Sequence, residues 1–494
     1  MSTKSTLQNH KTLLMLFFFL ITLIGNAQIG IGTTTPDATS MVDITSTTKG
    51  MLAPRMTTIQ RNAITSPADG LLVYDTDLKS FYYFSTPSGW LPLLNSLVGR
   101  TNFKRIKSAA DLAQELIDGG NTKYKLNSTT LYEINGTITL AFPIDLNNAY
   151  LQGLDSKNDI IKRTGNIFEG TTGGTIKGLT LTATGATSNV FNLNGSATQN
   201  LIFRDCVVTG SGNVGSISNY GLVFCSIIQF ATNANGITYN NITQLLLSNL
   251  GWFGDNTGTF EKLTGTFTLV QKQGGFSQVN TSAIGFDVSA NPAITGDAVL
   301  ESVVFTGSNT TGYVKPYTTG TYTGYNFNNS WNVRCAGIPT ESDANAVGDF
   351  AIDYPAGGGV NTTLTNTTAT KVLGNSTSYN LFRFANDAIP NNNNRLRYMG
   401  KKKRIFQVSG SVSFQVSNNS IYVIYIAKNG VPLTQYKIYG KGNIPLLATS
   451  DIVVLPINAS VELSNNDQIE VYAQRNSGTG TDVIVVPNAT IIIK

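Results

Sequence analysis

The chain has 494 residues, a length that predicts two to four domains. Only 13% of the residues are charged while 41% are hydrophobic, which excludes a disordered polyelectrolyte. The net charge of +5 is small for this length and gives no reason to expect nucleic acid as a partner. The single histidine, His10, lies in a segment that we expect to be removed, which excludes Ser-His-Asp and Cys-His catalysis from the mature chain.

Three cysteines, Cys206, Cys225 and Cys335, are too few and too widely spaced for a disulfide framework or a zinc cluster. Their expected role is that of small, buried apolar side chains. The mature chain also lacks histidine and a glycine-rich phosphate loop that ends in Lys-Ser or Lys-Thr. We therefore expect neither a metal nor a cofactor.

Residues 1–27 have the pattern of a secretory signal peptide. Lys4 and Lys11 precede the apolar run LLMLFFFLITLI, which is followed by Gly25-Asn26-Ala27. At about 1.5 Å per helical residue this run reaches only ~18 Å, whereas the apolar core of a bilayer is about 30 Å thick. We predict cleavage after Ala27 and export to the cell surface, the virion surface or the extracellular space.

Residues 28–98 form a small predicted N-terminal β adaptor. Alternating apolar residues at Leu71, Val73, Phe81 and Tyr83 predict short hairpins that close at Trp90. The segments IGIGTTTP, KGMLAPRMTTIQR and GLLVYDTD resemble a module that begins many exported surface proteins and phage tail-fibre-like proteins. That resemblance implies a base or anchor protein as the partner of this end of the chain.

Residues 99–124 are predicted to be a linker with a capping helix. The segment KSAADLAQELID places Leu112, Leu116 and Ile117 on one helical face, and Gly119-Gly120 ends the helix. A short amphipathic helix just before an array of strands fits a lid on the open edge of that array.

The middle of the chain repeats pairs of large apolar residues two positions apart, at a spacing of about 22 residues. The pairs are Leu179/Leu181, Leu201/Phe203, Leu222/Phe224, Leu245/Leu247 and Phe267/Leu269. This period is too short for propeller blades of about 40 residues, and it fits one turn of a parallel β-helix whose turns stack ~4.8 Å apart. We predict an all-β chain with a right-handed parallel β-helix over residues 125–360. Two stacked β-sandwiches, the alternative, would not explain the spacing.

Residues 361–494 lose the period and have longer alternating strands, as in a jelly-roll β-sandwich. Leu463, Asp467, Ile469 and Val471 match the L-x-x-G-D-x-V/I-x-V strand of tumour-necrosis-factor-like and complement-type heads, with Asn466 in place of the glycine. The segments VSGSVSFQVSNN and YIAKNGVPL add to that resemblance. It implies a homotrimer and a terminal or receptor-binding head of the kind that phage spikes and fibres carry.

Parallel β-helices also occur in pectate lyases and tailspike glycosidases, so carboxylate pairs about one turn apart are candidate catalytic residues. Glycoside hydrolysis needs two carboxyl groups about 5–9.5 Å apart. The best candidates by spacing are Glu133 with Asp155 and Asp145 with Glu169. Carboxylates that are solvated or that cap turns are the alternative interpretation.

Two further groups could bind a ligand. Aromatic faces near Asn and Thr suit stacking on sugar rings, or else packing at the end of the solenoid or between subunits; this group is Tyr313, Tyr317, Tyr322, Tyr325 and Trp331. A basic patch could bind anionic surface glycans, or else protect a strand edge from pairing; this group is Arg395, Arg397, Lys401, Lys402, Lys403 and Arg404.

The sequence therefore predicts a structural or receptor-binding surface protein, such as a spike, fibre or adhesin, that displays a head for cell-surface polysaccharide. A polysaccharide-degrading glycosidase or lyase on the β-helix and a passive assembly protein are the alternatives. The predicted signal peptide favours a cellular exported protein, whereas the order of shaft and head resembles phage spikes.

Overall fold

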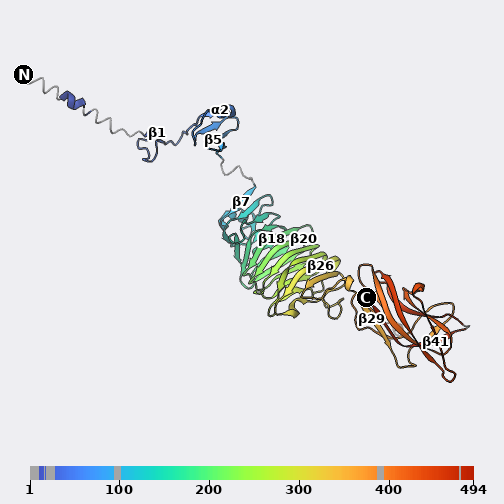
Figure 1. Ribbon diagram of the computed structural model, residues 1–494. Helices are drawn as coiled ribbons and strands as arrows, with labels where there is room; N and C mark the ends of the chain where they lie inside the picture. The colour runs from blue at the N-terminus through green and yellow to red at the C-terminus, as the bar shows by residue number, and fades with distance from the viewer. Residues whose placement is uncertain (1–9, 16, 18–27, 94–101, 387–393, 478–479) are drawn as a thin grey trace, which may run out of the picture. The chain divides into compact units, whose positions relative to one another are not determined.

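A computed structural model describes residues 10–15, 17, 28–93, 102–386, 394–477 and 480–494 (Figure 1). The chain divides into two compact units, residues 1–101 and 102–494. Most of the predicted signal peptide, residues 1–27, lies outside the described residues. Among the residues described, no helix has both the length and the apolar character needed to cross a membrane.

The first unit contains two small sheets. β1 (Ile29–Ile31) pairs in parallel with β2 (Val42–Ile44). The second sheet has the order β3-β4-β5-β6 and is accompanied by one helix; its elements are β3 (Arg55–Met56), α2 (Thr58–Asn62), β4 (Leu72–Asp75), β5 (Ser80–Ser85) and β6 (Gly89–Pro92). β4, β5 and β6 are antiparallel, so the predicted hairpins are present, and Trp90 closes them against Phe84 at 5.6 Å between ring centroids.

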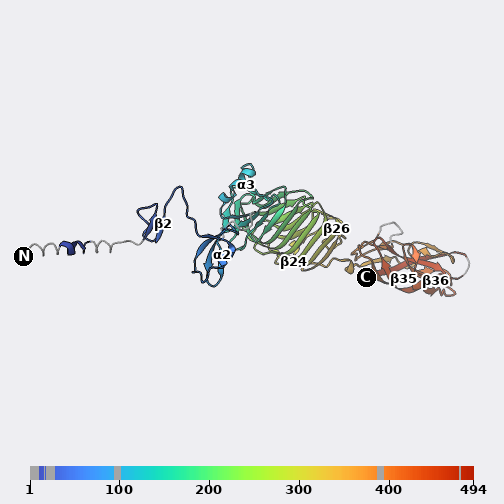
Figure 2. The ribbon, with the colours of Figure 1, turned by 90° about the horizontal axis from the view of Figure 1, so that it is seen from above.

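A parallel β-solenoid begins the second unit. In its described residues, one sheet follows the path β7 (Phe103–Ile106), β9 (Leu131–Ile134), β12 (Tyr150–Gln152), β15 (Gly174–Lys177), β18 (Asn200–Thr209), β20 (Leu222–Ala231), β22 (Gln244–Trp252), β24 (Thr266–Gln278), β26 (Ala293–Thr306) and β28 (Trp331–Ala336). β10 (Thr137–Thr139), β13 (Ile160–Thr164) and β16 (Thr180–Thr184) join this sheet beside the path. Figures 1 and 2 show successive strands of this sheet following one another along the solenoid.

The second sheet of the solenoid is also parallel. Its strands in order are β8 (Tyr124–Lys125), β11 (Ile144–Asp145), β14 (Phe168–Gly170), β17 (Asn189–Asn194), β19 (Asn213–Ser218), β21 (Ile237–Asn240), β23 (Thr259–Thr264), β25 (Ile284–Asp287) and β27 (Val314–Lys315). Parallel pairing within the solenoid runs from Phe103 to Ala336, whereas the sequence predicted the β-helix over residues 125–360.

The predicted stacking of successive turns in parallel is confirmed, but Leu222 does not lie in the predicted inner column. Leu201 pairs with Val223, and Val223 with Leu245, and all three are buried. Leu222 pairs instead with Asn200 and Gln244 and is only half-buried, so its side chain faces outward. A shift of one residue moves every side chain of a strand to the other face, and here both alternate sets of residues are apolar.

The column predicted from the five apolar pairs is also wrong at its first and last pairs, Leu179/Leu181 and Phe267/Leu269. Leu181 pairs with Val208 rather than Phe203, because its strand, β16, stacks on the second half of β18, while β15 stacks on the first half. Phe267 pairs with Ile294, and it is Val270 that continues the inner column of Leu245. The spacing of about 22 residues between turns remains, but the residue that points into the core is not the same member of the repeat in every turn.

A short helical segment precedes the strands at the start of the solenoid: η2 (Ala109–Leu112) and α3 (Ala113–Asp118), which Gly119 follows (Figure 2). Leu112 is buried, but Ile117 is exposed, so the predicted apolar face is wrong at that residue. The buried face carries Glu115 instead, whose carboxylate accepts hydrogen bonds from Lys104 Nζ at 2.6 Å and Tyr132 OH at 2.9 Å.

Residues 348–494 build two antiparallel sheets around a separate core. In the described residues, one sheet contains β29 (Gly348–Asp353), β30 (Thr362–Leu364), β32 (Ser376–Thr377), β35 (Arg404–Val416), β39 (Asp451–Leu463) and β41 (Asp482–Ile493). The other contains β31 (Thr370–Lys371), β33 (Phe384–Ala385), β34 (Arg395–Tyr398), β36 (Ile421–Lys428), β37 (Val431–Pro432), β38 (Ile438–Lys441) and β40 (Gln468–Arg475). β29 pairs with β41, so this sandwich begins before residue 361. Three short 3₁₀ segments, η3 (Thr310–Gly312), η4 (Asp343–Asn345) and η5 (Thr434–Tyr436), lie in connections.

One ion pair interrupts the apolar interior of the solenoid. Lys272 Nζ lies 2.9 Å from Glu261 Oε2, and both side chains are almost completely buried. The ammonium also lies 5.0 Å from the centroid of the Phe260 ring. Burial raises the pKa of the Glu261 carboxyl above its ordinary value, and the Lys272 ammonium opposes that rise.

We expect Lys272→Met to lower the stability of the fold by about 3–5 kcal/mol near neutral pH, because it leaves the Glu261 carboxylate buried without a cation. The loss should be smaller near pH 4, because the folded state, in which the pKa of Glu261 is raised, then keeps the carboxyl protonated. Thermal unfolding at both pH values measures this. The double variant Lys272→Met/Glu261→Leu is the control and should recover most of the loss; equal loss in single and double variants would contradict the account.

Candidate functional site

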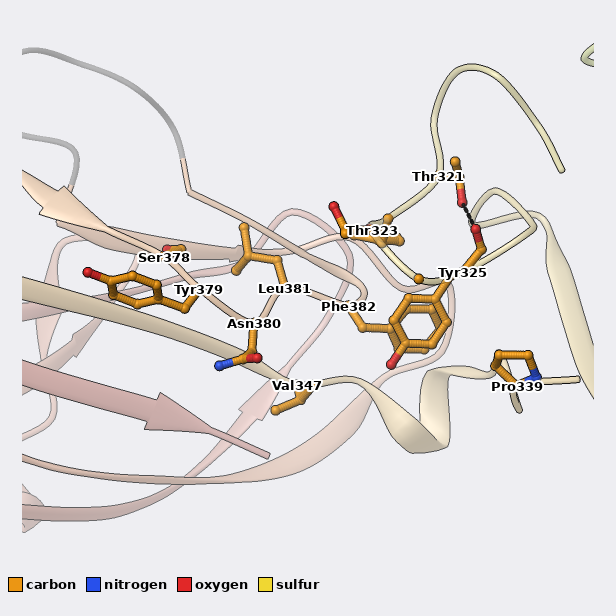
Figure 3. Close-up of a pocket in the computed structure, with 12 residues that line it drawn as sticks. Thr321, Thr323, Tyr325, Pro339, Val347, Ser378, Tyr379, Asn380, Leu381 and Phe382 are labelled. Atoms are coloured by element: carbon orange, nitrogen blue, oxygen red, sulfur yellow. Dashed lines mark hydrogen bonds between the residues drawn. The ribbon is translucent and has the colours of Figure 1, made fainter. Parts of the chain in front are cut away.

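A recess of about 780 Å³ lies where the last turns of the solenoid meet the sandwich. Two segments form most of it: residues 321–325, which precede β28, and residues 378–382, which precede β33. Pro339 and Val347 complete the lining (Figure 3). None of the residues that line the recess in the described structure is charged.

Four aromatic side chains line the recess. The Tyr325 ring stacks on Phe382 with centroids 4.1 Å apart and planes 20° apart, and Tyr322 meets Phe382 edge-on at 5.4 Å. Figure 3 shows this stack on one side of the recess and Tyr379 on the other. Tyr379 is 74% exposed, so its ring face is open to a ligand.

Hydrogen bonds fix both segments. Thr321 Oγ1 donates to the Tyr325 carbonyl at 3.1 Å, which closes the first loop (Figure 3). The Asp349 carboxylate on β29 accepts the backbone N–H groups of Tyr379 and Asn380 at 2.8 and 3.0 Å, and the Asn380 amide at 2.9 Å. Phe382 exchanges two backbone hydrogen bonds with Val347. The recess is therefore formed by ordered backbone and not by long side chains alone.

Tyr322 is held as a neutral donor. Its hydroxyl donates to Asn329 Oδ1 at 3.0 Å. Burial raises the pKa of Tyr322 above its ordinary value, although the bond to Asn329 and the nearby Arg383 guanidinium act in the opposite direction. At physiological pH the recess thus offers hydroxyl groups and aromatic faces without a fixed charge.

Arg383 connects the sandwich to the end of the solenoid. This residue is 1% exposed, and its guanidinium donates to the Trp331 carbonyl at 2.6 Å and to Asn329 Oδ1 at 3.0 Å. Its Nε lies 3.6 Å from Asp343 Oδ1. Because Arg383 directly follows Phe382, these contacts also set the position of the stacked aromatic pair.

The predicted aromatic residues divide into two groups. Tyr322 and Tyr325 line the recess, whereas Tyr313, Tyr317 and Trp331 are buried in the solenoid core. The indole Nε1 of Trp331 donates to Tyr317 OH at 2.9 Å, and that hydroxyl donates to the Pro292 carbonyl at 2.8 Å. We therefore restrict the proposed ligand contacts to Tyr322 and Tyr325.

Sequence reasoning missed the second half of the recess, in which Ser378, Tyr379, Asn380 and Phe382 lie. The signal that could have pointed to it is the pair of aromatic residues in SYNLF, which ends a stretch rich in Thr, Ser and Asn. Only the fold shows that this segment lies beside residues 321–325.

The candidate carboxylates have structural partners. Glu133 Oε1 accepts Arg105 Nε at 2.7 Å, and Asp155 accepts the backbone N–H of Lys157 at 2.9 Å in its own turn. Glu133 pairs in register with Gln152 on the next turn, so the strand register does not place it opposite Asp155.

The second pair lies on neighbouring strands. Ile144 pairs with Phe168, which puts Asp145 and Glu169 one step further on β11 and β14. Asp145 contacts Lys123 Nζ at 2.6 Å, and Glu169 accepts the Asn166 amide at 2.5 Å. As a catalytic pair, these residues stay a prediction.

The predicted basic patch is spread over several structural contacts. Lys401 Nζ donates to the Gly296 carbonyl at 2.6 Å, and Lys403 lies 3.2 Å from Glu462. The backbone N–H groups of Lys401 and Lys402 both donate to Asp343 Oδ2 at 2.8 Å. The three arginines of the patch contact Gln468, Asn466 and the Asp343 carbonyl; they are Arg395, Arg397 and Arg404, respectively. A role in binding anionic glycans stays a prediction.

Comparison with known protein families finds a match for one segment of the chain. Residues 30–108 match the family described as the phage tail-like trimerisation region. Among solved structures, the chain is similar to the enzymatically active domain of tailspike protein 4 of bacteriophage CBA120, with 11% identity, coverage of 90% of this chain and 77% of that chain, and a TM-score of 0.18. A TM-score this low carries no argument about this chain. No curated protein matches it.

We expect Arg383→Met to lower the unfolding temperature of the sandwich and to loosen the recess. It removes several buried hydrogen bonds, including those accepted by the Trp331 carbonyl and the Asn329 amide oxygen, a loss of about 2–4 kcal/mol. Differential scanning fluorimetry measures the unfolding temperature, and limited proteolysis of residues 337–347 measures the loosening of the recess. Arg334→Met, at an exposed position on β28, is the control; equal effects of the two variants would show that Arg383 has no special role.

Proposed function

We propose that this chain is a trimeric receptor-binding protein of the phage-tail type, displayed on a virion or cell surface, which uses the recess at residues 321–325 and 378–382 to bind a neutral glycan. The observation that carries the proposal is the uncharged, aromatic-lined recess on a chain whose residues 30–108 match a phage tail-like trimerisation region. The parallel solenoid supplies a rigid scaffold, on which loops at the end of the stack can carry recognition.

Exposed apolar residues in the first unit support the homotrimer. The side chains of Ile29, Ile31, Val42 and Ile44 on β1 and β2 are all exposed, as is Leu52 nearby. A monomer that left so many large apolar side chains in water would be unusual, whereas association of copies would bury them. These residues lie inside or beside the segment that matches the trimerisation region. Three recesses in one assembly would also bind a repeating polysaccharide with avidity.

The lining of the recess favours a neutral sugar. Aromatic rings such as Tyr379 and Tyr325 can stack on the apolar face of a sugar, and the hydroxyls of Thr321, Thr323 and Ser378 can exchange hydrogen bonds with its hydroxyls. An acidic glycan would need a cation in the recess to offset its desolvation, and the lining supplies none.

Glycan-array binding by the full-length chain tests the proposal. We expect Tyr379→Ala to weaken binding of the neutral glycan that the array identifies by roughly 1.5 kcal/mol, or about tenfold in Kd. The unfolding temperature should not change, because Tyr379 is exposed. Tyr325→Ala should weaken binding as well. Tyr439→Ala removes another exposed tyrosine, on β38 outside the recess, and should bind as the parent does.

Three results would overturn the proposal. Failure to bind any glycan or intact cells would indicate a passive assembly protein. Release of oligosaccharides that Glu133→Gln or Asp155→Asn abolishes would indicate an enzyme on the solenoid, with the recess at most an accessory site. Binding that survives Tyr379→Ala and Tyr325→Ala together would place the glycan elsewhere on the chain.

A further inference from the structure

The outer face of the first solenoid sheet carries a column of mostly apolar side chains. These residues alternate with the buried ones along each strand, so they point away from the core. In order along the solenoid, the column is Phe103, Leu131, Tyr150, Thr175, Ile202, Phe224, Leu246, Gln271 and Val299. We call this column the outer stripe. It extends from β7 to β26, about 40 Å at ~4.8 Å per strand.

The outer stripe is unusual for a sheet face exposed to solvent. Seven of its nine members are large apolar residues, and none is charged. Tyr150 is 38% exposed, and the other members are half-buried. On its amino-terminal side the neighbouring column alternates between polar and apolar residues, namely Asn200, Leu222, Gln244, Leu269 and Asp297. A single soluble copy would leave this whole surface in water.

Charged and polar residues border the stripe on its other side. Two positions further along each strand, a column in register contains Arg105, Glu133, Gln152, Lys177, Arg204, Ser226, Ser248, Gln273, Glu301 and Arg334. An apolar centre with a polar rim on one side is the composition of a protein interface.

We propose that the outer stripe is the surface through which the solenoids of three copies of this chain pack against one another. The inference rests on the homotrimer of the proposed function and names its interface in the solenoid. The stripe begins at Phe103, inside residues 30–108 that match the trimerisation region, so it is continuous with the segment that would hold the copies together. Around a threefold axis along the stacking direction, each turn meets the same turn of its neighbours.

The strand register makes that packing possible. Because Ile202, Phe224 and Leu246 lie at the same position of successive turns, they form a straight ridge and not scattered patches. Identical apolar side chains can meet at a threefold axis without repulsion, whereas a charge at any of these positions would meet its own copies at close range. The absence of charge along the described stripe fits this constraint.

Cysteine cross-linking of the full-length chain tests the interface. Phe224→Cys and, one turn later, Leu246→Cys are treated with a short bis-maleimide and compared by denaturing electrophoresis. Thr238→Cys is the matched control, because it faces outward from β21 on the other sheet, in the turn that begins with β20. The parent chain gives the background, since Cys206 and Cys225 are buried and only Cys335 is partly exposed.

We expect covalent dimers and trimers from Phe224→Cys and Leu246→Cys that the parent chain and Thr238→Cys lack. Light scattering of the untreated samples tests the homotrimer separately from the stripe as its interface. A trimer that cross-links equally at Thr238→Cys, or at neither stripe position, would overturn the stripe as the interface and leave the trimer intact. A monomer would overturn the proposed homotrimer itself.

Discussion

Parallel stacking in register is the constraint on which the rest of this structure depends. Each turn of the solenoid puts a residue directly over its equivalent in the previous turn, about 4.8 Å away. Apolar residues such as Leu201, Val223 and Leu245 gain from that arrangement because they form one continuous inner column. Like charges at equivalent positions of neighbouring turns repel each other, so the arrangement favours a low content of charged residues in the solenoid. The buried Lys272–Glu261 pair is tolerated because the two opposite charges lie 2.9 Å apart and neutralise each other.

The same constraint places the candidate site. Within the stack, every side chain is limited to a shape that its neighbours above and below can accept. At the end of the stack the limit no longer applies, and the loop at residues 321–325 can meet the sandwich segment at residues 378–382. Arg383 then binds the Trp331 carbonyl and holds the two parts in one arrangement. The recess therefore occurs where the fold permits irregular backbone, yet is still supported by rigid strands on both sides.

Periodicity predicted the fold well and the details of its register poorly. The spacing of apolar pairs indicates a parallel β-helix because it is too short for propeller blades and would not be explained by two stacked β-sandwiches. It could not tell that Leu222 faces outward, since in the sequence Leu222-Val223-Phe224-Cys225 both alternate sets are apolar. That ambiguity has a physical source, because the outer stripe is itself apolar. The recess was predicted only in part: Tyr322 and Tyr325 belong to a conspicuous aromatic run, whereas Tyr379 and Arg383 depend on a contact between segments far apart in sequence.

The most direct test of this account is an experimental density map of the full-length chain at side-chain resolution. The account predicts Leu201, Val223 and Leu245 in one inner column, with Ile202, Phe224 and Leu246 on the outer face of the same strands and turned toward the neighbouring copies. A map in which Ile202, Phe224 and Leu246 point into the core, or in which successive turns are not parallel, would contradict it.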